Sequence, residues 1–166
     1  MSAYELAQLN IGMIRGPMDS PLMAEFAANL ARINALAEGS PGFLWRLQTD
    51  AGDATAIRPF ENERMLVNMS VWRDVESLRQ YVYNTAHVSV MRRRREWFER
   101  MIEPFVVLWW VPRGHQPGVA EAIGKLELLR REGASVHAFT FREAYPPPDA
   151  KTSAVPVEFG DECPST

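Results

Sequence analysis

The sequence predicts an α+β fold from the order of its strand and helix patterns. Residues 4–12 alternate in polarity and end at Gly12, while residues 43–49 and 65–72 form two further strand patterns with no helix between them. A doubly wound parallel sheet would need a helix between successive strands. Helical patterns instead follow the first and third strands, and residues 105–111 predict the fourth. The order βαββαβ is typical of an antiparallel, ferredoxin-like domain.

The two helices of this pattern carry recognisable start and stop residues. Ser20 and Pro21 predict an N-cap followed by proline at the first helical position, and Gly39 predicts the helix end. Asp74 is suited to cap the second helix. Poor helix formers at residues 84–86 predict a kink in this second helix.

The fourth strand pattern, Phe-Val-Val-Leu-Trp-Trp-Val at residues 105–111, is apolar on both faces. This predicts a central strand that is covered on both sides. The two helices cover one face of the sheet, and a second copy of the same sheet is the simplest cover for the other. We therefore expect a homodimer in the form of a dimeric α/β barrel.

The remaining segments extend this pattern. Residues 119–131 predict a third helix and residues 136–142 an added strand, so we expect the domain to span residues 1–142. Residues 143–166 are rich in proline and predict a tail that is disordered or laid across a partner. Residues 50–64 predict a long hairpin connection, with a short extended piece near residues 54–58.

Composition restricts the function classes. The chain has 166 residues, 46% hydrophobic and 23% charged, as expected of one globular domain. A formal charge of −3 gives no attraction to nucleic acid or anionic membranes, and we expect neither as a partner. Four consecutive arginines at residues 92–95 point around a helix and predict a solvated face. With Cys163 as the only cysteine and no signal peptide pattern, we expect a cytoplasmic protein.

Several segments together resemble a known family. They are Leu-Val-Asn-Met-Ser-Val-Trp at 66–72, Tyr-Val-Tyr at 81–83, Ala-His at 86–87, Leu-Trp-Trp-Val-Pro at 108–112, Gly-His at 114–115 and Ala-Phe-Thr-Phe at 138–141. The sequence resembles the domain-of-unknown-function family 3291 over about residues 3–142. That family is similar to the dimeric α/β-barrel superfamily of antibiotic-biosynthesis-monooxygenase type. The superfamily includes cofactor-independent quinol monooxygenases, haem-degrading enzymes and small-molecule isomerases, so the fold alone does not decide the reaction.

The resemblance implies roles for particular residues. Haem-degrading relatives use an asparagine on the first strand and a histidine on the second helix, which match Asn10 and His87. Their tryptophan on the second helix is absent here, where Tyr81 or Tyr83 stands nearby, and this counts against haem degradation. Relatives that oxidise quinols use asparagine, tryptophan, tyrosine and arginine, and the matching residue types are Asn10, Trp72, Tyr83 and Arg46.

His87 is the foremost candidate for chemistry because it lies on the second helix with Tyr83 four residues before it. A histidine in a pocket can transfer a proton near neutral pH, and it can also ligate iron. The alternative is a core histidine bonded to a backbone carbonyl. His115, in a loop after the fourth strand, is a second candidate, whereas His137 is expected to pack. No histidine and carboxylate spacing predicts a metal site.

Tryptophans and polar residues on the strands suggest a binding pocket. Aromatic walls suit a flat conjugated ligand, although each tryptophan can equally fill the core or an interface. Trp109 and Trp110 must point to opposite faces. Asn68 and Ser70 share a face with Trp72 and either bind substrate or satisfy neighbouring backbone groups. An Arg46 side chain within the second strand is either paired with a carboxylate or available for an anionic ligand.

We interpret the chain as a cofactor-independent small-molecule enzyme, of monooxygenase or isomerase/cyclase type, acting on a hydrophobic aromatic or polyketide-like substrate. The expected catalytic residues are His87, Tyr83 and Asn10. The expected substrate-binding residues are Trp72, Asn68, Trp110, Trp45, Arg46 and His115. The alternatives are a haem or small-molecule binding protein without turnover, and a dimer whose pocket is only a packed core.

Overall fold

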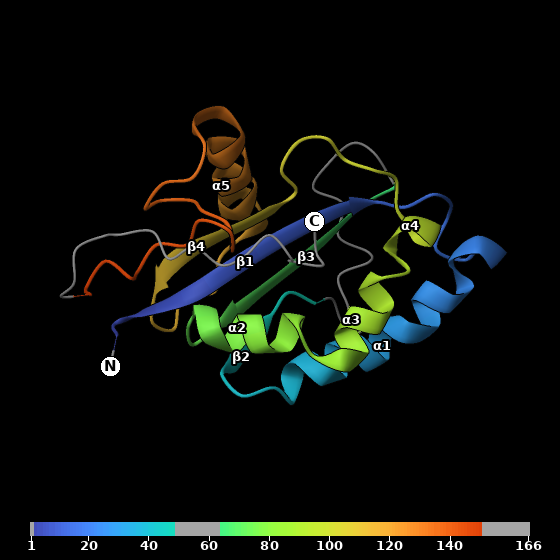
Figure 1. Cartoon of the computed structure of the whole chain (residues 1–166), viewed down its shortest axis with the longest axis horizontal. Coiled ribbons are helices and arrows are strands. Elements are labelled where there is room, and N and C mark those ends of the chain that lie inside the picture. Colours follow the sequence, from blue (N-terminus) through green and yellow to red (C-terminus); the bar gives the residue numbers. More distant parts are fainter. Residues whose placement is uncertain (1, 49–63, 151–166) are drawn as a thin grey trace.

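The computed structural model describes residues 2–48 and 64–150 (Figure 1). These residues form a four-stranded antiparallel sheet in the order β2-β3-β1-β4. Its strands are β1 (Tyr4–Met13), β2 (Phe43–Arg46), β3 (Met65–Trp72) and β4 (Val106–Pro112). With helices after β1 and β3, this topology confirms the α+β, ferredoxin-like prediction. The predicted extended piece near residues 54–58, and residues 50–63 of the predicted connection, lie outside the described residues.

In the described part of the chain, four α-helices cover one face of the sheet (Figure 1). After a 3₁₀ turn, η1 (Pro21–Met23), they are α1 (Ala24–Glu38), α2 (Val75–Val82), α3 (Thr85–Met91) and α4 (Arg94–Trp97). Ser20 occupies the N-cap position and Pro21 the first helical position as predicted, but of the 3₁₀ turn that leads directly into α1, and the Ser20 hydroxyl donates to the carbonyl of Pro17 instead of capping the helix. The predicted interruption after α2 is a complete break. The Asn84 side chain accepts from the Ala86 N–H at 3.0 Å and starts α3.

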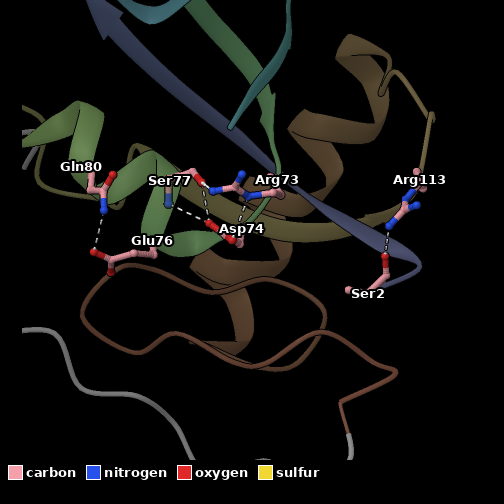
Figure 2. Close-up of polar contacts among 7 residues, drawn as sticks. All are labelled: Ser2, Arg73, Asp74, Glu76, Ser77, Gln80 and Arg113. Atoms are coloured by element: carbon pink, nitrogen blue, oxygen red, sulfur yellow. Dashed lines mark hydrogen bonds and ion pairs between the residues drawn. The ribbon is translucent and has the colours of Figure 1, made fainter. Parts of the chain in front are cut away.

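Asp74 caps α2 as its sequence position predicts (Figure 2). Its Oδ1 accepts from the backbone N–H of Ser77 at 2.8 Å and from the Ser77 hydroxyl at 2.7 Å. Arg73 donates to the same two side chains, at 3.4 Å to Asp74 and 3.2 Å to Ser77. This cluster fixes the direction in which α2 leaves β3, and thereby which side of α2 faces the sheet.

A further helix, α5 (Val119–Glu132), lies on the opposite face of the sheet (Figure 1). Its buried residues Ala122, Leu126 and Leu129 belong to one apolar cluster with residues of β1, β3 and β4. The expectation that the fourth strand is central is wrong, because β4 lies at one end of the sheet order. Its residues are apolar on both sides because Val107 and Leu108 are both fully buried, on opposite faces.

Residues after α5 pack against β4 instead of adding the predicted strand. Only Phe139 pairs with Leu108, through two backbone hydrogen bonds of 2.8 and 2.9 Å, so the strand expected over residues 136–142 is wrong. Ala144 is buried, and Asp149 accepts hydrogen bonds from Ser2 and Ala3. Residues 143–150 thus contact the domain and the residues just before β1, while the domain boundary at residue 142 stays a prediction. Residues 151–166 lie outside the described part.

The position of α5 changes the argument for a dimer. The sheet face for which the sequence suggests a second copy already carries α5, and its residues on β1 and β4 are buried within one chain. A second sheet is therefore not needed to cover them. The homodimer stays a prediction, which light scattering at micromolar concentration checks. Within the described ranges, no helix has the length and apolar character needed to cross a membrane.

We predict that Gly42→Ala destabilises the fold at the turn before β2. Gly42 has a φ of 85°, and a Cβ atom there would lie 2.2 Å from Ser77 Oγ. Backbone strain and the clash with the Asp74–Ser77 cap are expected to lower the free energy of unfolding by about 1–3 kcal/mol. Urea denaturation measures this change.

Gly124→Ala is the matched control. Gly124 lies within α5, and a Cβ atom added there would meet no other atom within 4 Å, so alanine is expected to raise the free energy of unfolding by roughly 0.5–1 kcal/mol. Equal stability of Gly42→Ala and the unsubstituted protein would show that the turn relaxes without cost.

Candidate functional site

A cavity of about 170 Å³ lies between the sheet and the helices α1 to α4. The floor is the sheet face whose side chains alternate with those packed on α5. Paired residues of β1 and β3 form successive rows across this floor: Gly12 with Leu66, Asn10 with Asn68, Gln8 with Ser70, and Leu6 with Trp72. The two middle rows are polar and the outer rows are apolar, so the cavity has a polar centre.

The polar rows are joined by hydrogen bonds. Gln8 Nε2 donates to Asn68 Oδ1 and to Ser70 Oγ, at 2.8 Å each. Asn10 Nδ2 donates to Gln8 Oε1 at 3.2 Å and to Asn68 Oδ1 at 3.3 Å. Trp72 Nε1 donates to Ser70 Oγ at 2.8 Å. A buried amide such as Gln8, which is 5% exposed, is thereby satisfied.

Some hydrogen-bond donors of this network have no partner in it and can bind a ligand. Ser70 Oγ accepts from two N–H groups, so its own O–H remains to donate. Asn68 accepts through Oδ1, and its Nδ2 has no hydrogen bond within residues 2–48 and 64–150. Donors that are held in place at the polar centre of a cavity are suited to an oxygen atom that carries or develops negative charge.

His87 lines the cavity from α3. Its Nδ1 lies 2.9 Å from the carbonyl oxygen of Val82 at the end of α2. A carbonyl can only accept, so Nδ1 carries the proton and Nε2 is the basic nitrogen of the neutral ring. Burial lowers the pKa of His87, and the bond to Val82 opposes this only in part. His87 is therefore a neutral imidazole with a basic nitrogen at neutral pH.

The ring of Tyr81 lies beside His87 and is stacked on that of Trp72. Tyr81 stacks on Trp72, with ring centroids 5.1 Å apart and an angle of 25°, and its ring centroid lies 4.7 Å from that of His87. Burial raises the pKa of Tyr81 far above its ordinary value, opposed by the charge of Arg46, so its phenol stays protonated. The stacked rings of Trp72 and Tyr81 form an aromatic wall at the Trp72 end of the cavity, with the His87 ring tilted by 56° from that of Tyr81.

The catalytic role expected for Tyr83 is not supported by its position. Tyr83 follows the last residue of α2, is 39% exposed and contacts the Arg79 guanidinium instead of the cavity. The break between α2 and α3 turns it outward. Tyr81, two residues earlier, takes the place near His87.

The structure separates the predicted substrate-binding residues into two groups. Trp72, Asn68 and Arg46 line the cavity together with Asn10. Arg46 is paired with a carboxylate, because its Nε lies 2.7 Å from Glu38 Oε1. Of the two roles that the sequence leaves open for Arg46, the structure shows pairing with a carboxylate.

The other three predicted residues do not line the cavity. Trp45 packs in the apolar cluster on the α5 side of the sheet. Trp110 donates through Nε1 to the Tyr145 carbonyl at 2.9 Å, in the contact with residues after α5. His115 is exposed, with Nε2 2.8 Å from Glu121 Oε1. These positions do not support the binding roles expected for the three residues. Strand alternation directs Trp45 to the α5 side, the segment after α5 covers Trp110, and His115, in the loop after β4, pairs with Glu121.

Sequence reasoning missed Gln8 and Arg94 as cavity residues, and it named Tyr81 only as an alternative to Tyr83. Alternation along β1 was a usable signal for Gln8, which stands two residues before Asn10. The signal for Arg94 was hidden in the arginine run at residues 92–95, whose spacing predicts a wholly solvated face. Arg94 instead points inward, toward Phe98 and Phe105.

The cavity does not fit a haem. The Nε2 atom of His87 could ligate iron, but the volume is too small. For comparison, an apolar cavity of about 150 Å³ in a protein binds one benzene molecule. A cavity of about 170 Å³ is slightly larger and has room for about one or two rings, which is less than the macrocycle of a haem needs. Within the described residues, no group of three or more His, Cys, Asp or Glu side chains is arranged to hold a metal ion.

The sequence matches the family model named Domain of unknown function (DUF3291) over residues 5–155. The chain belongs to this family. The family match confirms the resemblance found in the sequence and extends it beyond residue 142, in agreement with the packing of residues 143–150. No curated protein matches the sequence.

Solved structures give only remote likenesses. SnoaB, a cofactor-independent oxygenase from Streptomyces nogalater, is 21% identical, with 70% of this chain and 100% of that chain covered and a TM-score of 0.48. Rv0793 from Mycobacterium tuberculosis is 12% identical, with 69% and 99% covered and a TM-score of 0.44. A dabb family protein with a ferredoxin-like fold from Mesorhizobium loti is 16% identical, with 66% and 99% covered and a TM-score of 0.42. These TM-scores are too low to indicate a shared activity.

We predict that NMR titration of His87 gives a pKa below the ordinary value of 6.5. A lowered pKa means that the unfolded state binds a proton that the folded state excludes. The contribution of His87 to stability is therefore full above pH 6.5 and is lost as the pH falls through the pKa of the folded state. His87→Gln removes this component from the pH dependence of unfolding. A pKa at or above 6.5 would contradict the buried, neutral assignment.

Proposed function

We propose that this protein is a cofactor-independent enzyme that removes a proton from a small, hydrophobic aromatic substrate bound in the cavity. The observation that carries the proposal is the joint presence of a neutral buried imidazole and a row of unused hydrogen-bond donors. A base and donors in one apolar cavity are what an enolate or phenolate intermediate requires. The cavity volume favours about one or two rings over a larger polyketide-like substrate.

In the proposed mechanism, His87 Nε2 takes a proton from a hydroxyl group or from a carbon beside a carbonyl. The Asn68 amide and the Ser70 hydroxyl donate to the oxygen that becomes negative. Trp72 and Tyr81 hold the ring flat, and the protonated Tyr81 adds no negative charge that would oppose the anion. Asn10 orients the amides of Gln8 and Asn68.

Two reaction types follow from one anion. In a monooxygenase reaction, the anion gives one electron to dioxygen, and the two radicals combine into a peroxide. Loss of water then leaves a carbonyl, so the substrate loses two hydrogens and gains one oxygen atom while the other oxygen leaves as water. In an isomerase or cyclase reaction, the anion is protonated or bonded at a different carbon, and no oxidant is needed.

Proton abstraction is tested directly with 2-tetralone, a two-ring ketone, in D₂O under nitrogen. We expect the protein to accelerate deuterium exchange at C1 and His87→Gln to reduce this acceleration by about 10²–10⁴-fold, since the general base is lost. Proton NMR measures the exchange. Air is then admitted and an oxygen electrode measures oxygen consumption. A monooxygenase consumes dioxygen, whereas an isomerase or cyclase does not.

His115→Gln is the matched control, because His115 does not line the cavity, and its exchange rate should equal that of the unsubstituted protein. Circular dichroism checks that both variants fold. If 2-tetralone binds but exchanges no faster than in buffer, the protein is a binding protein without turnover and the proposed enzyme is overturned.

A further inference from the structure

Arg94 places a positive charge at the end of the cavity opposite to Trp72. Its guanidinium lies between two aromatic rings, 4.7 Å from the centroid of Phe98 and 4.7 Å from that of Phe105. It also lines the cavity. Cation–π contacts orient a guanidinium without neutralising its charge.

No carboxylate in the described ranges forms an ion pair with Arg94. Its hydrogen bond in this part of the chain is a long one, 3.5 Å from Nη2 to the carbonyl of Ile11. The other arginine of the cavity, Arg46, is paired with Glu38, and the neighbouring Arg93 is paired with both Glu25 and Glu96. Burial of a charge without a counter-charge is costly, and it lowers the pKa of Arg94. A ligand is the missing partner that this arrangement suits.

The backbone at Gly12 allows Arg94 and Phe98 to lie close to the floor of the cavity. A Cβ atom at Gly12 would stand 2.6 Å from the Phe98 ring and 3.4 Å from Arg94 Nη2. Gly12 is two residues from Asn10, which is about 7 Å along the strand. The cationic end is therefore adjacent to the row of Asn10 and Asn68, while the wall of Trp72 and Tyr81 forms the other end.

We propose that the ligand of this cavity carries a carboxylate and that Arg94 binds it. The Nε and Nη1 groups of Arg94 have no hydrogen bond in the described part of the chain, and Nη2 keeps a second N–H, so a fork of two parallel N–H groups is available to a planar carboxylate. The aromatic part of the ligand then lies over the polar rows toward His87. This inference rests on the proposed function, specifies its substrate class and makes Arg94 the residue that selects anionic substrates.

The test compares two ligands of equal shape and different charge, 2-naphthoate and 2-naphthamide, by isothermal titration calorimetry at neutral pH. We expect 2-naphthoate to bind at least about tenfold more tightly, as a charge-assisted hydrogen-bonded pair provides. Arg94→Gln should remove the difference. Arg94→Lys should keep part of it, since the charge remains and the planar pair of donors is lost.

Arg92→Gln is the control for net charge, because Arg92 is exposed and does not line the cavity, so the preference for 2-naphthoate should persist. Equal affinity of the two ligands for the unsubstituted protein overturns the proposal even if Arg94→Gln does not fold. A preference that survives in folded Arg94→Gln also overturns it.

The outcomes separate this inference from the proposed function. If 2-naphthamide binds as tightly as 2-naphthoate, the selection of anions is wrong while proton abstraction by His87 stands. If His87→Gln loses exchange with 2-tetralone yet retains the preference for 2-naphthoate, both proposals are supported independently. If neither naphthalene ligand binds, the cavity is not the proposed site and both are overturned.

Discussion

The rest of the site depends on the hydrogen bonds that join Gln8, Asn68 and Ser70 across β1 and β3. A buried amide that loses its partners costs roughly 1–3 kcal/mol, so the pairing of these strands is fixed by polar groups as well as by apolar packing. Any slip in register would separate the three side chains. The same register sets Gly12 at one end of the cavity floor and Trp72 at the other.

The fold was predictable for strands with one apolar face and one polar or exposed face. The periodicity of residues 65–72 gave the bounds of β3, and Asp74 gave the start of α2. The place of β4 was not predictable from its composition, because an apolar run shows that both faces are covered and not which strands lie beside it. Only tertiary packing of α5 and of the segment around Phe139 explains how an edge strand becomes so apolar.

The residues of the candidate site were predicted better on the strands β1 and β3 than at the breaks between helices. Asn10, Asn68 and Trp72 lie on strands, where alternation decides the face, and all three line the cavity. The strand residues Trp45 and Trp110 do not, because Trp45 lies on the α5 side and Trp110 is covered by residues after α5. Tyr83 and Arg94 lie where a helix breaks, and helical spacing fails at a break. The side chain at the end of α2 turns out to solvent, while one arginine of a charged run turns inward.

The two arginines of the cavity explain why a neutral histidine and a charged end can coexist there. Arg46 is neutralised by Glu38, so the Trp72 wall near His87 carries little net charge. Arg94 retains its charge at the Gly12 end, beside donors that are already oriented by Gln8 and Asn10. Because the unpaired charge of Arg94 lies at the Gly12 end, it draws the anionic group of a ligand away from His87. The carbon to be deprotonated then faces the His87 ring. The polarity of the cavity thereby orients a ligand before any chemistry begins.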